Sequence, residues 1–99
     1  MDYQLTWAPI ARQDMRDLVA YIADNNPRAA RKFARGVFQT IERLTQFPES
    51  GRMVPEFDDP AIREGIRKPV RIVYRVRTDE KEVEIVRVCL LYTSPSPRD

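Results

Sequence analysis

The sequence contains no histidine and only one cysteine, Cys89, among its 99 residues. These absences exclude a zinc site built from cysteine and histidine, a Ser-His-Asp triad and a Cys-His dyad, because each needs side chains that this chain lacks. A single cysteine also excludes an internal disulfide. We therefore expect neither a metal nor a cofactor.

Long apolar runs and glycine-rich loops are missing as well. No stretch is apolar for long enough to cross a membrane, and the N-terminus lacks a signal-peptide pattern, so we expect a cytoplasmic protein with no membrane partner. Only three glycines occur, and none belongs to a phosphate-binding loop. Because the chain shows no repeat, low-complexity segment or linker, we expect one domain.

The charges are nearly balanced. Seventeen basic and fifteen acidic residues give a formal net charge of +2. A global field this weak does not by itself predict nucleic-acid binding, so local clusters of cations would have to provide the evidence for it.

The most informative pattern lies in residues 66–88. From Val70 to Arg77, apolar residues alternate with a row that is mostly arginine, which is the period of a half-buried strand. Residues 78–81 are polar enough to turn the chain, and Val83 to Val88 is β-branched enough to pair back. The second strand alternates less cleanly, which predicts that it is covered on both faces. Guanidinium groups suit phosphates and carboxylates, so the arginine row is a candidate binding surface; a solvated sheet face is the alternative.

The first half of the chain predicts a short strand and two helices. Residues 2–7 alternate like a strand, and an apolar stripe with helical spacing predicts a helix over residues 9–24. Asn26-Pro27 serves as a stop and a start, so a second helix follows at once and forms an antiparallel hairpin with the first. Its outer surface is basic, and Gly36 inside it marks the close approach of another element. The basic residues of this helix are Arg28, Arg31, Lys32, Arg35 and Arg43.

The remaining segments complete the predicted fold. Residues 47–52 form a turn, residues 53–60 an extended loop, and residues 62–67 a further strand that ends before Lys68-Pro69. The resulting order is β-α-α-β-β-β. We therefore predict an α+β fold in which a two-helix antiparallel hairpin packs on one face of a small, mostly antiparallel sheet.

The last eleven residues, 89–99, break the strand pattern and become polar and proline-rich. A reverse-translated form of this peptide resembles a widely used transposon sequencing adaptor. We therefore expect the domain to comprise residues 1–88, and residues 89–99 to be a tail that is not native to the protein. Under this interpretation Cys89 is not a natural residue and the native C-terminus is missing.

Four blocks of sequence occur in an order that is specific in combination. They are FPESGR (residues 47–52), VPEF (54–57), IRE (62–64) and RIVYRV (71–76). Together with the helix stripes, they resemble the RelE/ParE superfamily of toxins from bacterial type II toxin-antitoxin modules, most closely the ParE, or plasmid-stabilisation, branch. The likeness covers nearly all of residues 3–88.

The resemblance implies a RelE-like fold and a partner, a short antitoxin that wraps the toxin and forms a hetero-oligomer with it. It also implies growth inhibition by one of two routes. Members similar to RelE are ribosome-dependent endoribonucleases that cut mRNA, whereas members similar to ParE block DNA gyrase and are not known as nucleases. Because one scaffold carries both functions, the site must decide whether the chain is an enzyme.

One residue carries over from the nuclease branch. Arg71 matches the arginine that RelE-like nucleases hold against the scissile phosphate, but residues 62–67 do not supply the two lysines of that branch. Glu49 or Glu56 could in principle serve as a base, although neither aligns well, so the catalytic residues are unknown. The arginines that we expect to bind the target or the antitoxin are Arg63, Arg67, Arg71, Arg75, Arg77 and Arg87.

The leading hypothesis is therefore a ParE-like toxin that inhibits DNA gyrase. One alternative is a RelE-like mRNA endoribonuclease acting at the ribosome, and another is a non-toxic relic that still binds antitoxin. An acidic, amphipathic antitoxin segment is expected to fold over the helix hairpin and the sheet edge and to cover part of the arginines. Tyr74 and Trp7 are assigned to the core or its rim.

Overall fold

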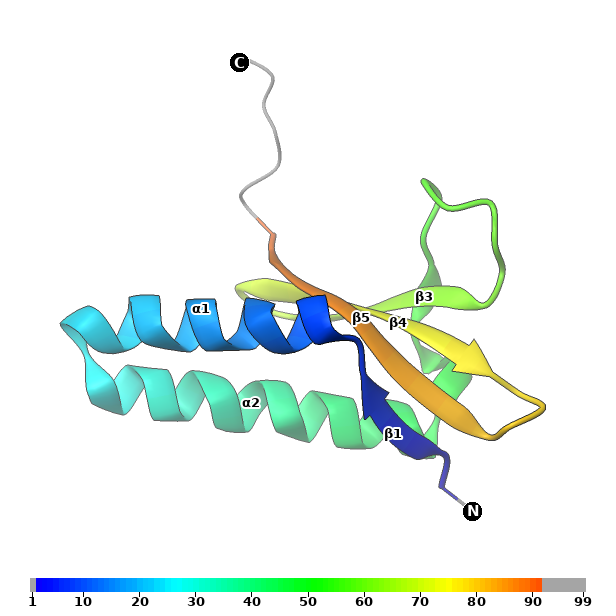
Figure 1. Cartoon of the computed structure of the whole chain (residues 1–99), viewed down its shortest axis with the longest axis horizontal. Helices are drawn as coiled ribbons and strands as arrows, with labels where there is room; N and C mark the ends of the chain where they lie inside the picture. The colour runs from blue at the N-terminus through cyan, green and yellow to red at the C-terminus, as the bar shows by residue number, and fades with distance from the viewer. Residues whose placement is uncertain (1, 92–99) are drawn as a thin grey trace.

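A computed structural model describes residues 2–91, and in it two helices cover one face of a sheet (Figure 1). Within these residues the elements, in chain order, are β1 (Gln4–Trp7), α1 (Pro9–Asn25), α2 (Pro27–Gln46), the short 3-10 turn η1 (Pro48–Ser50), β2 (Arg52–Met53), β3 (Ile62–Arg67), β4 (Val70–Arg77) and β5 (Glu82–Leu90). The sheet order is β1-β5-β4-β3-β2, and every neighbouring pair is antiparallel except β1 and β5, which run parallel. The predicted α+β fold is confirmed.

The helix hairpin forms as the sequence predicts. Pro9 and Pro27 each occupy the first turn of a helix, where the missing N–H needs no partner. The side chain of Asn26 accepts a hydrogen bond from the backbone N–H of Ala29 at 3.1 Å and so caps α2. Neither helix of the described chain has the length and apolarity for a membrane span.

The core lies between the helices and the sheet. The inward residues of β4, which are Val70, Ile72 and Tyr74, are fully buried, as the alternation predicts. The apolar stripes of the two helices pack on them. The buried stripe residues are Ala11, Met15, Ala30, Val37, Ile41 and Leu44.

Two details of the sheet differ from the expectation. Met53 belongs to β2 and not to the extended loop that we predict for residues 53–60, because two residues pairing with β3 are too few to produce an alternating pattern. The first strand begins at Gln4 and not at Asp2. The predicted order therefore gains one short strand at the edge of the sheet.

The irregular alternation of β5 has a cause beyond the one expected. Val73 pairs with Arg87 and Tyr74 pairs with Ile85, which leaves Val86 as the extra residue of a β-bulge. The bulge shifts the register by one residue, so that Val88 and not Arg87 faces the buried core. On the second face Val86 packs against the smaller buried cluster of Val54, Ile62 and Val73, so β5 is partly covered on that side as well. The strand also continues through Cys89 and Leu90, whereas residues 92–99 of the expected tail lie outside the described residues.

Tyr74 joins the sheet to the turn after α2. Its hydroxyl donates to the carbonyl of Pro48 at 2.7 Å and accepts from the N–H of Gly51 at 3.0 Å. A Cβ atom at residue 51 would collide with the Tyr74 hydroxyl and lie 2.5 Å from the carbonyl oxygen of Glu64, so only glycine fits there. Burial raises the pKa of Tyr74. The structural role predicted for this tyrosine agrees with its position.

We predict that Tyr74→Phe lowers the free energy of unfolding by about 1–3 kcal/mol, because the buried N–H of Gly51 and the half-buried carbonyl of Pro48 lose their partner. Urea unfolding of the full chain measures the change. Tyr21→Phe is the matched control, since Tyr21 is 74% exposed and should change stability by less than about 0.5 kcal/mol. Equal effects of the two substitutions would contradict the role of the Tyr74 hydroxyl.

Candidate functional site

The face of the sheet away from the helices carries three of the predicted arginines. The alternation along β4 places Arg71, Arg75 and Arg77 there, opposite the core residues Ile72 and Tyr74. Each of the three contacts a carboxylate.

Arg71 is held by the buried carboxylate of Glu64, whose side chain is only 2% exposed. The distances from Glu64 Oε1 to Arg71 Nη1 and from Glu64 Oε2 to Arg52 Nε are 2.9 and 2.5 Å. Burial acts to raise the pKa of Glu64, but the hydrogen bonds and charges of Arg52 and Arg71 outweigh it and leave the pKa below its ordinary value. The hydrogen bond with Glu64 raises the pKa of Arg71 in turn. The pairing ties β2, β3 and β4 together.

Arg75 and Arg77 are also compensated, by acids of the neighbouring strand and loop. Arg75 Nη1 lies 3.0 Å from Asp59 Oδ2, and Arg77 Nη2 lies 2.8 Å from Glu84 Oε1. The register places Glu84 directly opposite Arg75 and Glu82 opposite Arg77, so these are cross-strand ion pairs. The sequence could have indicated both pairs, because a short turn at residues 78–81 brings the two glutamates opposite the two arginines.

The other three predicted arginines lie elsewhere. Arg63 Nη1 donates to the carbonyl of Gly51 at 2.8 Å and so holds the turn after α2. The guanidinium of Arg67 lies against Gly36 of α2. Arg87 makes two hydrogen bonds to Asp14 of α1, at 2.9 and 3.1 Å, beside the edge of β5. The structure therefore does not bring the six arginines together into one surface.

The two candidate bases are exposed carboxylates. Glu49 lies in η1 and Glu56 lies in the loop between β2 and β3, where its charge adds to the raised pKa of Arg71 after the larger effect of Glu64. Over residues 2–91, no group of acids and cysteine is arranged to hold a metal ion. The described part of this face thus presents arginines that are already paired with acids.

Comparison with known proteins agrees with this architecture. Residues 5–89 match the family model described as the ParE toxin of the type II toxin-antitoxin system parDE. Among solved structures, the chromosomal ParDE system from P. aeruginosa is similar with a TM-score of 0.69 and 24% identity, over 89% of this chain and 95% of that one. The RelBE2 toxin-antitoxin complex from Mycobacterium tuberculosis follows with a TM-score of 0.64 and 20% identity, over 91% and 99% of the two chains.

The isolated RelE toxin from E. coli has the same fold, with a TM-score of 0.60 and 14% identity over 94% of this chain and 88% of that one. No curated protein matches the sequence. At these identities the structural likeness establishes the fold, and the family model establishes the relationship.

We predict that Glu64→Gln lowers the free energy of unfolding by about 1–3 kcal/mol at neutral pH, because an uncharged amide cannot hold two guanidinium groups. The pKa of Glu64 is lowered in the folded state, so the carboxylate stabilises the fold at neutral pH. This contribution is lost as the pH falls below the ordinary value of 4.5 and through the folded-state pKa. The stability gap between the wild type and the variant should therefore narrow in acid.

Urea unfolding at neutral pH and at about pH 3 measures this gap. Glu49→Gln is the control, since it neutralises an exposed carboxylate and should be nearly silent at both pH values. A gap for Glu64→Gln that stays constant with pH would show that the charge of Glu64 does not stabilise the fold.

Proposed function

The chain belongs to the family of ParE toxins of type II toxin-antitoxin systems, and on that premise we propose that it inhibits DNA gyrase and is neutralised by a cognate antitoxin. Inhibition by binding needs a stable, specific surface and no proton transfer. Its expected location is the cytoplasm, where gyrase acts.

The pairing of Arg71 with Glu64 is the observation that favours this function over RNA cleavage. A ribonuclease needs cations free to meet the scissile phosphate and a base for the attacking hydroxyl. In this chain the arginine at the nuclease position already has a buried carboxylate partner, and Arg75 and Arg77 are compensated as well. Of the candidate bases, Glu49 and Glu56 are both exposed.

Exposed apolar side chains support the antitoxin partner. Leu5, Ile10 and Phe38 are 41%, 51% and 51% exposed. Phe38 packs edge-on against Trp7, with ring centroids 6.1 Å apart, so β1 and α2 both contribute to this region. Large exposed apolar residues mark interaction sites, and an amphipathic segment that folds on contact would cover them. The structural neighbours include toxin-antitoxin complexes, which fits such a partner.

We predict that excess purified chain abolishes the supercoiling of relaxed plasmid by gyrase, and that prior addition of the antitoxin restores it. Phe38→Ser should still inhibit gyrase but bind the antitoxin at least about 10-fold more weakly, because it removes an exposed aromatic anchor. Tyr21→Ser is the matched control, with an aromatic ring removed from an exposed position on α1. Gel analysis of plasmid topology and a titration with antitoxin provide the two readouts.

Unimpaired supercoiling at excess protein would contradict gyrase inhibition. The alternative is a RelE-like mRNA endoribonuclease. The fold that the chain shares with the E. coli RelE toxin is compatible with this alternative. Cleavage of ribosome-bound message in the same preparation would favour that alternative. Harmless expression in a sensitive host, with antitoxin binding intact, would favour the non-toxic relic.

A further inference from the structure

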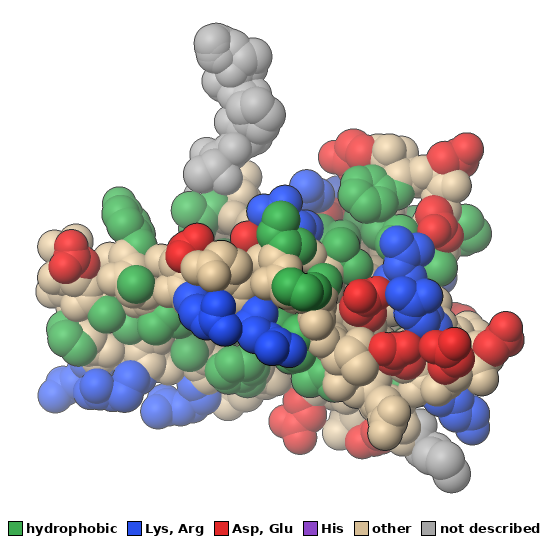
Figure 2. Space-filling model, in the orientation of Figure 1, with side chains coloured by type: hydrophobic (Ala, Val, Ile, Leu, Met, Phe, Trp, Pro, Cys, Tyr) green, Lys and Arg blue, Asp and Glu red, His purple; other side chains and the backbone are tan. Residues whose placement is uncertain are grey.

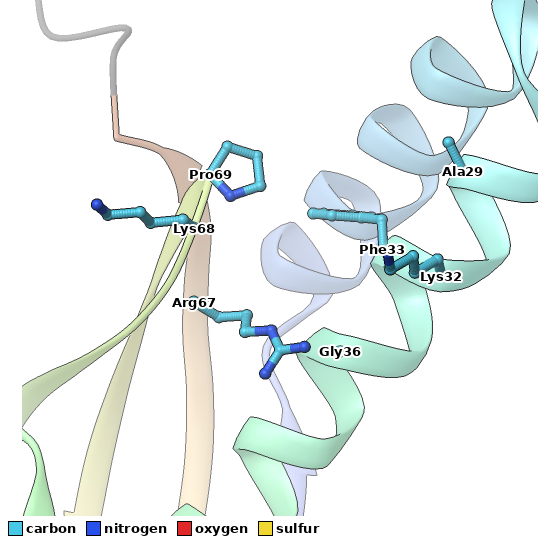
Figure 3. Close-up of a pocket in the computed structure, with 7 residues that line it drawn as sticks. All are labelled: Ala29, Lys32, Phe33, Gly36, Arg67, Lys68 and Pro69. Carbon is cyan, nitrogen blue, oxygen red and sulfur yellow. The ribbon is translucent and has the colours of Figure 1, made fainter.

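A small pocket lies between α2 and the turn that joins β3 to β4. Its volume is about 240 Å³, and Figure 3 shows Arg67 reaching it from the sheet side, with Phe33 and Gly36 on the helix side, whereas the Lys68 side chain points away from α2 at the rim. Lys32 and Pro69 complete the lining that matters here. The pocket is smaller than a typical ligand pocket of about 300–1,000 Å³, so it suits a single chemical group rather than a whole small molecule.

The cations of this pocket are not compensated. Lys32, Arg67 and Lys68 are all exposed, and none of them makes an ion pair with any residue of the described range 2–91. This is the opposite of the open face of the sheet, where Arg71, Arg75 and Arg77 are each paired. Within the described residues, the cations of this pocket are therefore unpaired, whereas the β4 arginines on the open face of the sheet are paired with acids.

The first half of α2 extends this positive charge beyond the pocket. Arg28, Arg31 and Lys32 occupy its first two turns, and Arg35 follows one turn later, so that all four lie along one side of the helix. The first turn contains no acidic residue, although the positive end of the helix dipole favours acids there. Figure 2 shows blue side chains gathered along the α2 edge of the molecule and red ones toward the β4–β5 end. Positive side chains at the positive end of the helix dipole destabilise the helix. Binding of an external anion would offset this repulsion.

Gly36 sets the position of the guanidinium in the pocket. It is buried, and a Cβ atom there would lie 2.7 Å from Nη2 and 2.8 Å from Nε of Arg67. The absence of a side chain at residue 36 therefore lets the guanidinium lie directly on α2, where it completes the cation set. The expectation that Gly36 marks a close approach is confirmed.

We propose that these cations bind the phosphate backbone of duplex DNA, with one phosphate in the pocket and its neighbours along Arg28, Arg31 and Arg35. The helix rises about 10 Å from residue 28 to residue 35, a stretch over which one strand of duplex DNA carries about three phosphates. A straight, rigid row of cations suits this regular line of charge. The surface binds without sequence preference, because only phosphates are contacted.

The same surface fits an acidic peptide less well. A peptide segment that folds on its partner is anchored by large apolar side chains. The pocket offers it only small residues and the edge of Phe33, which already packs in the core. The exposed apolar residues Leu5, Ile10 and Phe38 are not part of its lining.

The test measures the binding of the full chain to a fluorescent random-sequence duplex by anisotropy at several salt concentrations. Each lost phosphate contact should reduce the slope of log K against log salt by about 0.9. Lys32→Gln/Arg67→Gln should therefore lower the slope by nearly 2 and weaken binding at low salt by 10-fold or more. The control Arg12→Gln/Lys81→Asn makes the same change in net charge at exposed positions outside the pocket and should leave the slope unchanged.

Gly36→Ala separates geometry from charge. It removes no cation, but its Cβ displaces the Arg67 guanidinium, so binding should weaken while the melting temperature stays the same or rises. A retained melting temperature also shows that the variant is folded. Undiminished DNA affinity in Gly36→Ala would overturn the proposed position of the phosphate.

Three further results would overturn the proposal. The first is equal slopes for the pocket variant and its charge-matched control. The second is tighter binding to single-stranded RNA than to duplex DNA. The third is that the chain binds a polyglutamate peptide but not duplex DNA, and that the pocket variant abolishes this peptide binding. Because gyrase inhibition is read from supercoiling and this proposal from direct binding, either can fail without the other.

Discussion

The burial of one carboxylate, that of Glu64, controls how charge is arranged in this protein. A buried carboxylate is costly unless cations hold it, and Glu64 is held by Arg52 and Arg71 from two other strands. This pairing fixes the short strand β2 to the sheet and takes Arg71 out of the set of free cations. The arginine row that dominates the sequence thereby becomes mainly part of the architecture.

A charge asymmetry follows from the pairing. On the open face of the sheet, acids from β5 and from the loop before β3 compensate the arginines of β4. On α2, arginines and lysine lie along one side with Glu42 as the single acid of the helix. A net charge of only +2 therefore conceals two faces of different character. A partner that binds through its phosphates and a partner that binds through apolar side chains can then contact different parts of one small domain.

Most of the fold could be predicted because it depends on periodicity. The alternation of residues 70–77 and the helical stripe of α2 determine which side chains face the core, and the structure buries those residues. The β-bulge at Val86 and the two-residue strand β2 could not be predicted, because neither leaves a pattern long enough to detect. Both depend on pairing with other strands.

The site was harder to predict for the same reason. Residue types alone grouped Arg63, Arg67 and Arg87 with the arginines of β4, but strand register and helix packing place each beside a different partner, namely the Gly51 carbonyl, Gly36 and Asp14. In the sequence, Glu64 stands out only as part of the IRE block at residues 62–64. Its role became visible once β2, β3 and β4 were aligned.

The most direct test of this account is the titration of Glu64 itself, followed by NMR through the chemical shift of its side-chain carboxyl carbon in the folded protein. If two guanidinium groups hold the carboxylate, its titration midpoint lies below the ordinary value of 4.5. A midpoint at or above that value would mean that burial outweighs the arginines. The stabilisation of the carboxylate by Arg52 and Arg71 would then be weaker than this arrangement requires, and the argument against a nuclease would lose its support.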